Sequence, residues 1–114
     1  MSLLRSNAVH EPRLFDIMRS FHSQIISNPT VSKAEAAASK YKLDAFSGEA
    51  DDVINHPDVE AVWICSPSSF HAEQIKACAA AGKHVFCEKP IATDLAETIE
   101  AINACNNAGV KLMT

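Results

Sequence analysis

A chain of 114 residues with 47% apolar and 21% charged residues has the composition of a globular protein, which excludes a disordered or fibrous one. Its formal net charge is −4 and its ten Lys and Arg residues form no basic patch, so we expect no nucleic-acid partner. No apolar run approaches the roughly 20 residues that span a membrane, and the first residues show no signal or transit peptide, so we expect a cytoplasmic protein without membrane contact.

The first 27 residues fit a regular pattern less well than the rest of the chain. Residues 23–27 have the composition of a strand, and four apolar residues at helical spacing follow Pro12, namely Leu14, Ile17, Met18 and Phe21. Nothing before them has the pattern of a buried first strand. We therefore treat residues 1–27 as a partly helical N-terminal segment and residues 28–114 as the folded domain.

From residue 28 onward, helical and extended patterns alternate. They predict helices at 32–41, 48–56, 69–82 and 93–109, and strands at 44–47, 58–67, 83–88 and 110–114. Ser32 and Glu35 have the spacing of a capping box in the first helix. Asp94 and Glu97 have N-cap spacing in the last helix, and two of the helices end at a glycine, Gly82 and Gly109.

The apolar residues of these segments predict how the segments are buried. Val62, Trp63 and Ile64 belong to a nearly continuous apolar run, as in a strand that is covered on both faces. The last helix has one apolar face, made of Leu95, Ile99, Ile102 and Cys105. Strands that alternate with helices of about a dozen residues indicate an α/β domain with a doubly wound parallel sheet.

Two loops that follow predicted strands carry polar residues, and ligands of such sheets bind beyond the carboxyl ends of the strands. In the first loop, the hydroxyls of Ser66, Ser68 and Ser69 precede His71, which begins a helix whose N-terminus would suit an anion such as a phosphate. The alternative is that the serines only cap this helix and that His71 is a surface residue.

The second loop follows the strand at 83–88. Burying Glu88 or Lys89 without a partner would be costly, so this charged pair is either solvated or held for a ligand. Pro90 restricts the backbone of Lys89 and thereby the direction of its ammonium group. A lysine placed in this way can donate to a substrate hydroxyl or shift the pKa of a neighbouring acid–base group.

These two stretches, Ser-Pro-x-x-x-His at 66–71 and Ala-Gly-Lys-His-Val-x-Cys-Glu-Lys-Pro at 81–90, occur together. With their surroundings they resemble the nicotinamide-cofactor domain of the Gfo/Idh/MocA oxidoreductases, from about Ser32 to Thr114. The resemblance implies a Rossmann-like fold, NAD or NADP as cofactor, and a polyol, cyclitol or sugar as substrate, as in an inositol 2-dehydrogenase-like enzyme. It also implies that the intact enzyme is a homo-oligomer.

The resemblance assigns roles to particular residues. Ser66, Pro67 and His71 would lie along the cofactor, and the family's Glu-Lys-Pro signature would be three further cofactor-binding residues, Glu88, Lys89 and Pro90. Lys89 would also be the catalytic residue beside the nicotinamide and the substrate hydroxyl. The family implies a constrained or cis peptide before Pro90. The position that often carries a ribose-binding acid falls near Ser27 and Asn28, so NAD and NADP both stay open.

The chain also departs from the family pattern. A dinucleotide fingerprint needs three glycines at G-x-G-x-x-G spacing, whereas the glycines here are Gly48, Gly82 and Gly109. We therefore expect the first βα unit with its glycine-rich loop to be missing, together with the C-terminal substrate domain that supplies the acid–base His and Asp. On this view the 114 residues by themselves are catalytically inactive.

Two other functions fit the sequence less well. A non-enzymatic truncated or interaction domain with the same fold is the main alternative, and a phosphoacceptor receiver domain is disfavoured because Asp51 and Asp52 fall in a predicted helix. No metal is expected, because the five histidines lack ligand spacing. The four cysteines have no C-x-x-C spacing and lie in apolar segments, so we expect buried, reduced thiols at Cys65, Cys78, Cys87 and Cys105.

Overall fold

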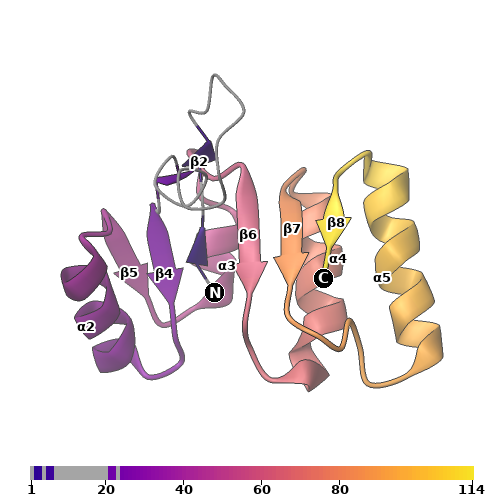
Figure 1. Ribbon diagram of the computed structural model, residues 1–114, viewed down its shortest axis with the longest axis horizontal. Coiled ribbons are helices and arrows are strands. Elements are labelled where there is room, and N and C mark those ends of the chain that lie inside the picture. The colour runs from indigo at the N-terminus through magenta and orange to yellow at the C-terminus, as the bar shows by residue number, and fades with distance from the viewer. Residues whose placement is uncertain (1, 4, 7–20, 23) are drawn as a thin grey trace, which may run out of the picture.

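The computed structural model describes residues 2–3, 5–6, 21–22 and 24–114 of the chain (Figure 1). The strands are β1 (Ser2–Leu3), β2 (Arg5–Ser6), β3 (Phe21–His22), β4 (Ile25–Ser27), β5 (Ala45–Ser47), β6 (Ala61–Ile64), β7 (His84–Cys87) and β8 (Leu112–Met113). The helices are α2 (Val31–Tyr41), α3 (Ala50–Ile54), the 3-10 turn η1 (Ser68–Phe70), α4 (His71–Ala80) and α5 (Leu95–Ala108).

Every helix and strand predicted beyond residue 28 is confirmed, with shorter bounds for most of them. The strand predicted at 23–27 is confirmed as β4, so the sheet begins within the segment 1–27. Of the residues assigned to an N-terminal helix, Leu14, Ile17 and Met18 lie outside the described residues, and Phe21 belongs to β3.

Six strands form the main sheet in the order β5-β4-β1-β6-β7-β8, and β2 and β3 form a separate antiparallel pair (Figure 1). The pairs β4–β5, β6–β7 and β7–β8 are parallel, as predicted. The prediction of a wholly parallel sheet is wrong at the centre, because β1 runs antiparallel to both β4 and β6. Since both neighbours oppose β1, they point the same way, and the carboxyl ends of β4 to β7 lie at one edge.

The chain winds outward from the centre in both directions. It passes from β4 to β5 through α2 and from β6 to β7 through α4, so right-handed crossovers place these helices on opposite faces of the sheet. The main core joins the sheet to α3, α4 and α5, and its fully buried side chains include Val53, Ile64, Ile75, Cys78 and Cys105. The buried alanines of α2 lie outside that cluster.

The helix ends agree with the predicted caps in part. The Asp94 carboxylate accepts a hydrogen bond of 2.9 Å from the Glu97 backbone N–H, and Gly109 ends α5 with a φ of 70°, where a side chain would be strained. The capping box of Ser32 and Glu35 is wrong. Helix α2 begins one residue earlier, with Thr30 as N-cap, so Ser32 already lies inside the helix.

The apolar face predicted for the last helix is wrong in its orientation. Ala101 and Cys105 are the buried residues of α5, whereas Leu95, Ile99 and Ile102 are exposed. Helix α5 packs closely against α4, and its buried side chains, which are small, permit the close approach. Only Cys105 of the four predicted residues therefore faces the core.

Strand β6 is fully buried on one face and half-buried on the other. Val62 and Ile64 face the core with 1% and 0% exposure, while Trp63 is half-buried and packs edge-to-face on Phe86 at 5.0 Å between ring centroids. The prediction of full cover on both faces is therefore wrong. No helix within the described ranges is long and apolar enough to cross a membrane.

Candidate functional site

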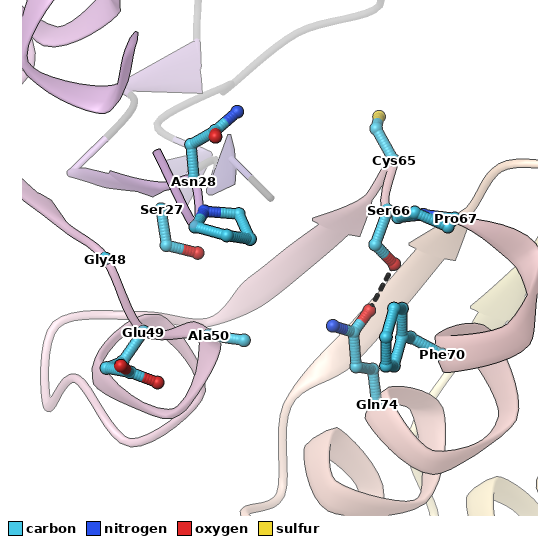
Figure 2. Close-up of a pocket in the computed structure, with 11 residues that line it drawn as sticks. Ser27, Asn28, Gly48, Glu49, Ala50, Cys65, Ser66, Pro67, Phe70 and Gln74 are labelled. Carbon is cyan, nitrogen blue, oxygen red and sulfur yellow. Dashed lines mark hydrogen bonds between the residues drawn. The ribbon is translucent and has the colours of Figure 1, made fainter. Parts of the chain in front are cut away.

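A pocket of about 450 Å³ opens at the carboxyl edge of the sheet, where β4, β5 and β6 end (Figure 2). The loops that line it follow β4 and β5 on one side of the central strand β1, and β6 on the other side. The direction in which the chain winds reverses at this point, and ligands of doubly wound folds bind there. The lining residues come from three loops and the start of α4: Ser27, Asn28, Pro29, Gly48, Glu49, Ala50, Cys65, Ser66, Pro67, Phe70 and Gln74.

On the β6 side, the pocket is shaped by the loop predicted from the sequence. The Ser66 hydroxyl donates a hydrogen bond of 2.5 Å to Oε1 of Gln74, which lies in the first turn of α4. Since that oxygen is the acceptor, the amide nitrogen of Gln74 faces the pocket on the side of Ala50 (Figure 2). Gln74 therefore offers N–H donors to a bound molecule.

On the opposite side, β4 and β5 supply polar groups and one close backbone approach. Oδ1 of Asn28 accepts a hydrogen bond of 2.9 Å from the Thr30 backbone N–H, and Glu49 contributes an exposed carboxylate. Gly48 lies against α2, because a Cβ atom at this position would come within 2.8 Å of Cγ2 of Val31. A larger residue at position 48 would force the Val31 side chain, this loop or the start of the helix to shift.

His71 is not on the surface, so the alternative of a surface histidine is wrong. Its side chain is 2% exposed and lies between the two predicted loops. Nδ1 lies 2.6 Å from the backbone oxygen of Pro90, and Nε2 lies 2.7 Å from the backbone oxygen of Ser66. The ring does not line the pocket, and its direct contact with a cofactor stays a prediction.

The Glu-Lys-Pro stretch lies on the same edge, beside the end of β6. Cys87 pairs with Ile64 in the parallel register of β6 and β7. The Glu88 backbone N–H donates a hydrogen bond of 2.9 Å to the carbonyl oxygen of Ile64. Glu88, Lys89 and Pro90 are all exposed, and the peptide before Pro90 is cis, as the resemblance implied. None of the three lines the pocket, so their roles with cofactor and substrate stay predictions.

The structure therefore unites some predicted residues and separates others. Ser66 and Pro67 line the pocket, whereas the Glu-Lys-Pro stretch lies beside it. Sequence reasoning missed Gly48, Phe70 and Gln74 as pocket residues. The signal for Gln74 was its place in the first turn of a helix that follows a buried strand, because that turn faces the ligand edge.

The cysteines carry free thiols, as predicted, but they are not all buried. Cys78, Cys87 and Cys105 are buried, whereas Cys65 is exposed and lines the pocket, because it follows the last residue of β6. Burial raises the pKa of Cys78 to about 12 and that of Cys87 to about 11. The described ranges contain no cluster of three or more His, Cys, Asp or Glu side chains that could hold a metal ion.

These thiols predict a loss of stability in alkali. The pKa values of Cys78 and Cys87 lie above their ordinary 9.0, so the folded chain holds these protons more tightly than the unfolded chain. Their contribution is fully present below pH 9 and disappears as the pH rises through about 11 and then about 12. Urea unfolding across this range should show a falling free energy of unfolding. An unchanged decline in the double variant Cys78→Ala, Cys87→Ala would contradict this assignment.

The strand order, the opposed crossovers and the edge pocket define a doubly wound α/β domain of the Rossmann type with a ligand-sized pocket at its switch point. The model of the Gfo/Idh/MocA oxidoreductase family, NAD-binding Rossmann fold, matches residues 5–114. The chain belongs to this family. Asp51 and Asp52 lie in helix α3, as predicted, and not directly after the first strand, where a receiver domain would need its acidic pair.

Named relatives and solved structures agree with the family assignment. The chain is 38% identical over 99 residues to an uncharacterized oxidoreductase, YrbE, of Bacillus subtilis, covering 85% of this chain and 29% of that protein. It is 44% identical over 89 residues to myo-inositol 2-dehydrogenase of Thermotoga maritima, covering 78% of this chain and 27% of that protein. It therefore spans less than a third of the length of these relatives.

Two solved structures show the same fold. A probable dehydrogenase from Thermotoga maritima superposes with a TM-score of 0.78 at 34% identity, over 80% of this chain and 28% of that one. A levoglucosan dehydrogenase in complex with NADH and levoglucosan gives a TM-score of 0.73 at 28% identity, over 78% of this chain and 25% of that one.

Proposed function

We propose that this chain binds a nicotinamide dinucleotide, with the adenosine half in the edge pocket, as part of an NAD(P)-dependent dehydrogenase of polyols, cyclitols or sugars. The observation that carries the proposal is the pocket itself, which lies at the switch point of a doubly wound sheet. Family membership and the myo-inositol 2-dehydrogenase relative support the class of reaction.

The residues present fit the adenosine half of such a cofactor. Hydroxyl and amide groups from Ser66, Gln74 and Asn28 suit the edge of a base and the hydroxyls of a ribose, and Glu49 adds a carboxylate acceptor. A backbone cradle for the pyrophosphate would need glycines after the central strand. In the described part of the chain that strand is β1, whose carboxyl end points to the opposite edge.

The other half of the proposal concerns the second loop. A bound nicotinamide supplies a hydride acceptor or donor. The exposed ammonium of Lys89 would donate a hydrogen bond to the substrate hydroxyl and hold it in place, since this lysine follows β7 on the same edge. The resemblance implies that the acid–base His and Asp lie in a separate substrate domain, so we propose that these 114 residues bind cofactor without turning over a substrate.

The proposal is tested by titrating the chain with NADH while exciting Trp63, the only tryptophan. Trp63 lies in β6, three residues before Ser66, so bound NADH should accept its excitation energy. We expect saturable micromolar binding that AMP displaces, because AMP would fill the adenosine part of the pocket.

Reduced nicotinamide mononucleotide is the control for this titration. It absorbs the same light but lacks adenosine, so it should give no saturable transfer in the same concentration range. Lys89→Ala should leave AMP binding unchanged and weaken NADH binding. No saturable signal with NADH up to millimolar concentration would overturn the proposal.

A further inference from the structure

The buried ring of His71 contacts two backbone oxygens, one in each loop of the candidate site. Ser66 supplies one oxygen, at 2.7 Å from Nε2, and Pro90 supplies the other, at 2.6 Å from Nδ1. A carbonyl oxygen can only accept a hydrogen bond, so each nitrogen must carry a proton if both contacts are attractive. A neutral imidazole has only one N–H and would leave the second nitrogen and oxygen facing each other with lone pairs.

We propose that His71 is held as an imidazolium and acts as a positioning residue that clamps the two loops together. Both distances lie at the short end for N–H···O bonds, as is usual when the donor is charged. The clamp joins segments that are separated in the sequence, the loop after β6 and the loop after β7. Both loops follow strands whose carboxyl ends lie at the edge that carries the pocket and Lys89.

The charged neighbours do not account for the clamp by themselves. The titratable groups on the segments that adjoin the ring along the chain are Glu73 on α4, Cys65 after β6, Cys87, Glu88 and Lys89 at the end of β7, and Asp94 before α5. In the described part of the chain none of them forms an ion pair with the ring. The dipole of α4 disfavours a positive charge at its first residue, so the two carbonyl oxygens must stabilise it.

The consequence for the site rests on the proposed function. Ser66 lines the pocket and Lys89 precedes the Pro90 carbonyl, so the clamp holds a pocket residue and the candidate catalytic lysine at a set separation. His71 would therefore support cofactor and substrate placement without touching either. This differs from the cofactor contact that the sequence predicted for it.

The first experiment is nuclear magnetic resonance of the chain labelled with ¹⁵N-histidine, without any ligand. The His71 ring signals are identified by their loss in His71→Gln. We expect two slowly exchanging ring N–H groups for His71 at neutral pH, which no merely space-filling role would require. One N–H together with one unprotonated ring nitrogen would overturn the clamp.

The second measurement is amide hydrogen exchange of the two loops in His71→Gln, which removes the charge and one of the two opposed donors. We expect exchange in both loops to be faster by about tenfold or more. The control is His84→Gln, an exposed residue of β7 away from this edge, which should leave both loops unchanged. Unchanged exchange in His71→Gln would also overturn the clamp.

The two proposals fail separately. Two ring N–H groups and loosened loops in His71→Gln would support the clamp even if NADH does not bind. A neutral ring would overturn the clamp even if NADH binds with micromolar affinity.

Discussion

Replacing Ile75 by alanine should lower the free energy of unfolding by about 3 kcal/mol, within the range of about 2 to 5 kcal/mol that such truncations cost. Ile75 is 0% exposed and lies on α4, the helix that packs against β6, β7 and α5. Its truncation removes apolar contacts and leaves a cavity at the centre of the core. Because the free energy of unfolding of small domains is only about 5 to 15 kcal/mol, this single change removes a large part of it.

Urea unfolding followed by Trp63 fluorescence measures this effect, with an unchanged dependence on urea showing that the unfolding reaction is the same. The matched control is Ile99→Ala on α5, where the side chain is 49% exposed. It should cost less than about 1 kcal/mol, because an exposed side chain loses little burial. Equal losses in the two variants would contradict the orientation of α5 described above.

Replacing Ser66 by phenylalanine should weaken NADH binding by at least about tenfold, or about 1.4 kcal/mol. The half-buried Ser66 side chain lines the pocket and fixes Gln74 through its hydroxyl, so an aromatic ring would both fill the space and release the amide. The backbone oxygen that contacts His71 is retained in this variant. Isothermal titration calorimetry measures the affinity without relying on Trp63.

The control for this variant is Ser69→Phe, three residues further along the chain, in the 3-10 turn η1. Ser69 is exposed and does not line the pocket, so its replacement should leave NADH affinity unchanged. Circular dichroism establishes that both variants are folded. If Ser66→Phe binds NADH as well as the unchanged chain, the cofactor does not occupy this pocket.

Much of this architecture was readable from local patterns. Alternating runs of apolar and helix-forming residues located every strand and α-helix beyond residue 28, though not the 3-10 turn η1. The pair Asp94 and Glu97 located the start of α5, since a cap is a contact between near neighbours. The motifs at 66–71 and 81–90 identified the family for the same reason, because each is a continuous stretch of sequence.

Contacts between distant segments decided the rest. The antiparallel direction of β1 depends on its pairing with β4 and β6, and the exposure of Ile99 depends on which side of α5 meets α4. His71 is buried because the loops before and after it converge on its two ring nitrogens. The sequence by itself thus determined the elements and the family. Only the tertiary structure decided which side chains meet at the carboxyl edge, because that depends on packing between residues far apart in the chain.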